Sequence, residues 1–151
     1  MLAPAIKICG INTPQALDAA LASRADYIGL VFFAKSPRNV SLRAAAALGE
    51  RASGRAKVVG LFVDADASFI SEAAIAARLD VIQCHGSETP ETVAQLRGSL
   101  GSPVWKALSV ATRDDVLRAQ DYAGAADLVL FDAKAPKGAF ASKSTRSAAP
   151  A

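Results

Sequence analysis

The sequence has few of the residues on which several protein classes depend. Its two cysteines, Cys9 and Cys84, lie far apart in a chain of 151 residues, which argues against a disulfide framework and indicates reduced thiols in the cytoplasm. No metal-binding spacing surrounds the only histidine, His85, so we expect no metal site. No apolar run approaches the roughly 18 residues of a membrane span, and the first residues lack the charged and apolar regions of a signal peptide. We therefore expect neither a membrane span nor a secretory leader.

Charge is close to balanced as well. The chain has 17 Lys and Arg against 14 Asp and Glu, which leaves a net charge of +3. The basic residues are scattered and form no stripe, so we expect no nucleic-acid partner, whereas a small anionic substrate suits this charge. With 52% apolar residues, the composition is that of a globular chain long enough for one domain with a single core.

What the sequence does contain is a repeated pattern of short apolar runs and Ala-rich amphipathic stretches. The runs are typical of strands that are buried on both faces. The expected strands are Ile6–Cys9, Tyr27–Phe33, Lys57–Val63, Val81–Cys84, Val104–Leu108 and Leu128–Phe131. The expected helices are Pro14–Ser23, Leu42–Ala52, Ser68–Arg78, Pro90–Leu100 and Arg113–Ala123. Thr13 and Thr89, each followed by proline, and Ser41 and Thr112 are suitable N-caps.

Strict alternation of strand and helix predicts an α/β fold with a parallel sheet. An open doubly wound sheet and a closed eight-stranded barrel share this pattern. The length favours the open sheet, since barrels usually need roughly 200 residues, whereas the strand ends favour the barrel. We therefore expect an incomplete parallel (βα)8 barrel of the TIM type, with about six βα units, over residues 1–138. The pattern stops at Gly138, and residues 139–151 are expected to be a disordered or non-native tail.

Polar residues stand at the ends of the expected strands, where βα barrels place their chemistry. Alternation puts Lys7 and Cys9 on one face of the first strand, and Gly10 leaves room beside the thiol. Cys9 is a candidate general base as a thiolate, or else a small apolar core residue. The loop after the second strand carries Lys35 and Arg38, which suits a carboxylate or phosphate, although a solvated basic loop fits equally well.

The later strands end in further candidates. Gln83 and His85 share the inward face of the fourth strand, whereas Cys84 faces the helices as core packing. His85 is either a site residue or a satisfied structural histidine. Asp132 follows an apolar run, so it either caps the next turn or lies in an apolar mouth as a general acid. Lys106 is one more polar residue near a strand end.

Six segments carry a resemblance to a known family: KICGINTP from Lys7, GLVFFAKSPRNVS from Gly29, VVGLFVD from Val58, VIQCHGSETP from Val81, WKAL from Trp105 and LFDAK from Leu130. In these segments, which follow in order along the chain before Gly138, the sequence resembles the phosphoribosylanthranilate isomerases of tryptophan biosynthesis. The combination of KICG, FxxKSPR and QxHGxE in this order is specific.

The resemblance implies a cofactor-free Amadori rearrangement of N-(5-phosphoribosyl)anthranilate, a small phosphorylated substrate, to 1-(2-carboxyphenylamino)-1-deoxyribulose 5-phosphate. It implies that Asp132 is the general acid that opens the sugar ring and that Cys9 is the general base that deprotonates C2. It also implies that Arg38 faces the anthranilate carboxylate, while Gln83 and His85 line the same mouth.

The sequence departs from the family after Gly138, where the glycine-rich GGxG and GLxPxNV-like segments that hold the phosphate are absent. We therefore expect reduced affinity and turnover. The unpaired first and sixth strands favour self-association, misfolding or a rearranged open sheet. The alternative is a non-catalytic assembly module that pairs through these edges. An open receiver or nucleotide binder is disfavoured, because GINT after the first strand is neither acidic nor glycine-rich.

Overall fold

The computed structural model describes residues 4–133, in which strands and helices alternate strictly. The strands are β1 (Lys7–Cys9), β2 (Tyr27–Phe32), β3 (Lys57–Phe62), β4 (Val81–Cys84), β5 (Val104–Val110) and β6 (Leu128–Ala133). The helices are α1 (Pro14–Ala22), α2 (Leu42–Ala52), α3 (Ala67–Ala77), α4 (Pro90–Leu100) and α5 (Arg113–Leu117), followed directly by the 3₁₀ helix η1 (Arg118–Tyr122). The expected tail, residues 139–151, lies outside the described residues.

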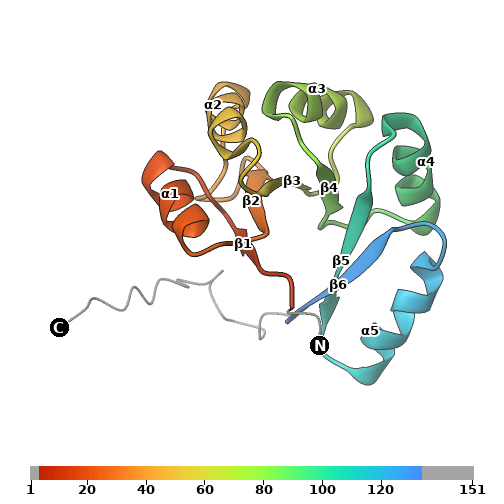
Figure 1. The fold of residues 1–151 in the computed structure, drawn as a ribbon. Helices are drawn as coiled ribbons and strands as arrows, with labels where there is room; N and C mark the ends of the chain where they lie inside the picture. Colours follow the sequence, from red (N-terminus) through yellow and green to blue (C-terminus); the bar gives the residue numbers. More distant parts are fainter. Residues whose placement is uncertain (1–3, 134–151) are drawn as a thin grey trace.

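The six strands form one parallel sheet in which each strand pairs with its neighbour in the sequence, from β1 through to β6. A doubly wound sheet would instead reverse its strand order at a switch point and carry helices on both faces. Figure 1 shows the helices α1 to α5 in an arc outside the strands. The described residues therefore form part of a βα barrel, which confirms the barrel prediction and excludes the open sheet.

The helix starts follow the capping signals in the sequence. All four predicted N-caps form: the side chains of Thr13, Ser41, Thr89 and Thr112 each accept a hydrogen bond from the backbone N–H three residues later. The expected single helix over residues 113–123 is wrong, because α5 gives way to η1. This tighter turn buries Tyr122, whose hydroxyl donates to the Glu88 carbonyl oxygen at 2.8 Å. None of the described helices is long and apolar enough to cross a bilayer.

Side-chain alternation divides the core into two parts. Val59, Val81 and Trp105 form a cluster on the inner face of the sheet, and Tyr27 packs edge-on against Trp105 with ring centroids 5.1 Å apart. The alternate strand residues, Ile82 among them, pack outwards against the helices in a larger cluster. Burial on both faces explains why the strands are continuous apolar runs.

The two edges of the described sheet are β1 and β6, as predicted. Large apolar side chains are exposed at both edges: Ile6 at 50% and Ile8 at 40% on one side, Leu128 at 43% and Phe131 at 56% on the other. Within residues 4–133, these side chains have no neighbouring strand and helix of the kind that cover the equivalent positions in the middle of the sheet.

Candidate functional site

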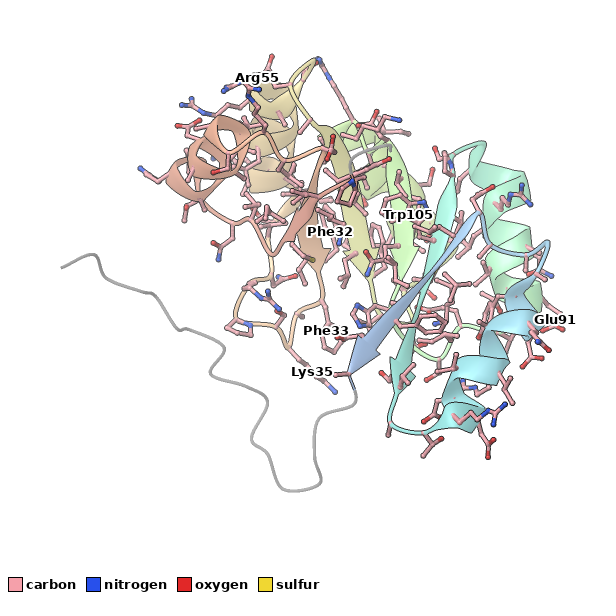
Figure 2. The ribbon with its side chains drawn as sticks, turned by 60° about the horizontal axis from the view of Figure 1, so that its bottom comes forward. Phe32, Phe33, Lys35, Arg55, Glu91 and Trp105 are labelled. Atoms are coloured by element: carbon pink, nitrogen blue, oxygen red, sulfur yellow. The ribbon has the colours of Figure 1, made fainter. Side chains whose placement is uncertain are left out.

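The five predicted site residues all lie at the carboxyl ends of the strands. Because the strands are parallel, these ends share one side of the molecule. Figure 2 shows the strand arrowheads pointing towards the end that carries Phe33 and Lys35, with Arg55 at the opposite end. Lys7 and Cys9 share one face of the first strand, as predicted. The register shows that this face points inward, since Lys7 and Cys9 pair with Tyr27 and Gly29, and Tyr27 packs on the inner cluster.

The guanidinium of Arg38 lies against the backbone of Cys9 at the end of β1. One guanidinium nitrogen of Arg38, Nη1, donates to the carbonyl oxygen of Cys9 at 3.4 Å. The loop places the arginine by folding back, with the Arg38 N–H donating to the Ser36 hydroxyl at 3.1 Å. Gly10 has a φ of +87°, and a Cβ there would lie 2.6 Å from the Arg38 side chain. Only glycine therefore suits this position.

Glycine also makes room for the Cys9 thiol inside the barrel. A Cβ on Gly29 of β2 would lie only 2.9 Å from the Cys9 sulfur. Cys9 is exposed, whereas Cys84 is 1% exposed on the helix-facing side of β4. Burial raises the pKa of the Cys84 thiol to about 12, with the nearby Glu88 charge adding to the effect. Cys84 is core packing, as predicted, and Cys9 is the thiol available for chemistry.

Gln83, His85 and Asp132 form a chain of hydrogen bonds across the same end. The Gln83 amide nitrogen lies 3.3 Å from His85 Nδ1, and His85 Nε2 lies 3.1 Å from an Asp132 carboxylate oxygen. An amide NH₂ can only donate, so Nδ1 accepts and the ring proton is assigned to Nε2, which donates to Asp132. The other Gln83 amide atom, Oε1, is buried and has no hydrogen-bond partner among the residues that the structure describes. The geometry thus orients the imidazole towards the carboxylate.

The surroundings of Asp132 differ from the expectation of an apolar mouth. Its side chain is 58% exposed, and its one described partner is the His85 ring. The apolar run before it does not enclose it, because alternation turns Phe131 towards the outer face while Leu130 packs on the inner cluster. At the edge of the described sheet, no strand beyond β6 covers the carboxylate. Of the two alternatives expected for Asp132, residues 4–133 alone do not form the apolar mouth around its carboxyl.

The pairing of two residues next to the candidate site, Lys106 and Glu88, was not predicted from the sequence. Lys106, expected simply near a strand end, is 1% exposed and forms an ion pair with Glu88 at 2.7 Å. Glu88 is the last residue of the QxHGxE segment, and its acidic side chain was the one feature of the sequence that could have pointed to it. Together they hold the turn that follows His85. Among residues 4–133, no group of three His, Cys, Asp or Glu side chains is placed to hold a metal ion.

Comparison with known proteins identifies the family. The model of the family described as N-(5'phosphoribosyl)anthranilate (PRA) isomerase matches residues 6–144. The N-(5'-phosphoribosyl)anthranilate isomerase of Rhodopseudomonas palustris strain BisA53 is 52% identical over 134 residues, which cover 89% of this chain and 62% of the relative. The chain thus spans about three fifths of the length of this relative.

Solved structures agree. The chain resembles monomers generated from the dimeric phosphoribosylanthranilate isomerase of Thermotoga maritima, with a TM-score of 0.79 and 31% identity over 87% of this chain and 65% of the other. It also resembles a phosphoribosyl anthranilate isomerase in complex with reduced 1-(o-carboxyphenylamino)-1-deoxyribulose 5-phosphate, with a TM-score of 0.81 and 29% identity over 87% and 66%. This chain belongs to the N-(5'-phosphoribosyl)anthranilate isomerase family.

Proposed function

We propose that the whole protein converts N-(5'-phosphoribosyl)anthranilate to 1-(2-carboxyphenylamino)-1-deoxyribulose 5-phosphate in the cytoplasm. The observation that carries this proposal is the placement of Cys9 and Asp132, the residues that match the family's base and acid, at the carboxyl ends of β1 and β6. Both side chains lie on the inward face of their strands. Acid and base on one rim suit a reaction that consists of proton transfers.

In the first step, Asp132 acts as the general acid. Its carboxyl proton passes to the ring oxygen of the ribose, the C1–O bond breaks, and the nitrogen lone pair forms an iminium. One carboxyl oxygen of Asp132 accepts the hydrogen bond from His85, which leaves the other oxygen to carry the proton. Bound substrate would cover this carboxyl, which is exposed in the described residues, and would exclude water from the proton transfer.

In the second step, Cys9 acts as the general base. The iminium acidifies the adjacent C2–H, so the thiolate removes this proton and the electron pair forms an enolamine, which tautomerises to the ketone. Gly29 leaves the space in which the sulfur can approach the sugar. Arg38 lies beside Cys9, where its guanidinium suits the anthranilate carboxylate.

Calorimetric measurement of the affinity for the reduced product analogue tests the binding site independently of catalytic turnover. Arg38→Met should weaken binding by about 10- to 100-fold, the loss of a charge-assisted hydrogen bond. Arg55→Met, at the opposite end of the molecule, is the matched control and should bind like the wild type. Equal affinities in wild type and Arg38→Met, or no binding at millimolar analogue, would refute the assignment of the site.

A fluorescence assay of substrate turnover tests the two proton-transfer roles. Cys9→Ser and Asp132→Asn should abolish turnover while they keep analogue binding within a few-fold. Turnover by the 151-residue chain alone also checks the expectation of reduced activity. Wild-type rates in either variant would remove the residue concerned from the mechanism.

We also propose self-association of this chain as a second function, because the edge strands expose Ile8 and Phe131. Light scattering should then show a dimer or larger species that Phe131→Lys converts to monomer. Ile75→Lys on α3, where the isoleucine is 78% exposed away from the edges, is the control and should leave the assembly intact. A monomeric wild type at all concentrations would exclude this function.

A further inference from the structure

The ion pair between Lys106 and Glu88 is the most deeply buried charge in the described residues. The side chains are 1% and 5% exposed, and Nζ lies 2.7 Å from Glu88 Oε2. Burial of two charges is costly, and replacing such a pair with apolar residues is often neutral or stabilising. Fold stability alone therefore does not account for this pair, and its hydrogen bonds suggest another role.

These bonds converge on the turn from residue 85 to residue 88. Lys106 Nζ donates to the carbonyl oxygen of Gly86 at 2.6 Å, and the N–H of Gly86 donates to the Glu88 carboxylate at 2.9 Å. The second Glu88 oxygen accepts from the backbone N–H of Asp64, and the Asp64 carboxylate accepts from the N–H of Ser87 at 2.6 Å. Both backbone groups of Gly86 are thus held by the pair, and the turn is tied to the end of β3.

The turn begins at His85, whose own backbone is fixed as well. Its N–H donates to the carbonyl oxygen of Phe62 on β3 at 2.8 Å. The backbone of His85 is therefore held by β3, and that of the next residue, Gly86, by the ion pair. This leaves His85 little freedom to move, and its ring lies within hydrogen-bond distance of Asp132. These bonds fix the backbone that carries the imidazole, while Gln83 and Asp132 contact the ring itself.

We propose that the Glu88–Lys106 pair is a positioning device, which holds the turn so that His85 donates its Nε2–H to Asp132. The catalytic meaning of this arrangement rests on the proposed function, in which Asp132 is the acid. The positioning itself does not, because it is a property of the free protein. Among residues 4–133 neither side chain of the pair is hydrogen-bonded to Asp132, so the pair acts through His85.

The imidazole provides a direct readout, because His85 is the only histidine in the chain. Ring ¹⁵N and ¹H signals in NMR spectra of the free protein therefore need no assignment. Glu88→Gln and Lys106→Met should shift these signals towards those of Asp132→Asn, in which the ring loses its carboxylate partner. Arg51→Met, which breaks an exposed ion pair with side chains 51% and 43% exposed, should leave them unchanged.

The double variant Glu88→Gln/Lys106→Met separates positioning from stability. It buries no net charge, so it should fold, whereas the loss of the Lys106 bond to the turn should still shift the His85 signals. A folded single or double variant with wild-type ring signals would overturn the proposal. If no variant folds, the pair serves stability alone, and the proposal is equally wrong. If the wild type does not bind the product analogue, the proposed function is refuted, whereas the positioning of His85 by the Glu88–Lys106 pair is unaffected.

Discussion

Raising the pH above 9 should destabilise the fold through Cys84. Burial, followed by the charge of Glu88, raises the pKa of this thiol from 9.0 to about 12. A pKa that is higher in the folded than in the unfolded state contributes stability that is complete below pH 9 and is lost as the pH rises from 9 to 12. At pH 10 the unfolded thiol is about 90% ionised while the folded thiol stays neutral, so the loss is about 1.4 kcal/mol.

Urea denaturation at pH 7.5 and pH 10 measures this loss. The wild type and Cys9→Ala, the exposed-thiol control, should each lose about 1.4 kcal/mol more than Cys84→Ala between the two pH values. Burial also raises the pKa of Tyr122, but that residue is present in all three proteins, so the difference between variants isolates Cys84. The same pH dependence in the wild type and Cys84→Ala would refute the argument from burial.

Three further predictions concern packing, capping and the histidine. Gly49→Ala in α2 should lower the free energy of unfolding by about 1–3 kcal/mol, because its Cβ would collide with the backbone of α3. Gly98→Ala in α4 should raise the free energy of unfolding by about 0.5–1 kcal/mol, because no described atom lies within 4 Å of the new Cβ. Denaturant midpoints of the two variants that move in the same direction would contradict this contrast. Thr89→Ala should cost about 1 kcal/mol in the same assay, through loss of the α4 cap; an unchanged midpoint would show that the cap contributes nothing. Gln83→Leu should shift the Nδ1 ¹⁵N signal of His85, since the donor to Nδ1 is lost; an unchanged Nδ1 signal would contradict the assigned chain.

The strands and most helices could be predicted because their signals are local. Val81–Cys84 is predicted with its observed bounds, since it is a short apolar run bounded by polar residues. The helix after residue 112 could not be predicted to its end, because the burial of Tyr122 against the Glu88 carbonyl is a contact between distant segments. The alternation of strands and helices also fits both an open sheet and a closed barrel. The strand order, which distinguishes the two, is seen only in the structure.

The same limit applies to the site. That Lys7 shares a face with Cys9, and Gln83 with His85, follows from the two-residue period of a strand. The inward direction of the Cys9 face comes from the structure. The pairing of Lys106 with Glu88 joins the strand β5 to the turn after β4, and no local pattern indicates it. The exposure of Asp132 depends on what lies beyond β6, which an apolar run before the aspartate does not reveal.

The candidate site has two halves, which are connected through the sheet. Cys9, with Arg38 beside it, belongs to β1 and the loop after β2, whereas the His85–Asp132 pair spans the ends of β4 and β6. Within residues 4–133 no direct hydrogen bond joins the halves, so the continuous ladder of strand pairs sets their relative position. The curvature of that ladder depends on the side chains packed inside it, with Trp105 the largest in the inner cluster. The packing of the inner core therefore controls how far the thiol lies from the carboxylate, and a substitution there can alter the chemistry without touching either group.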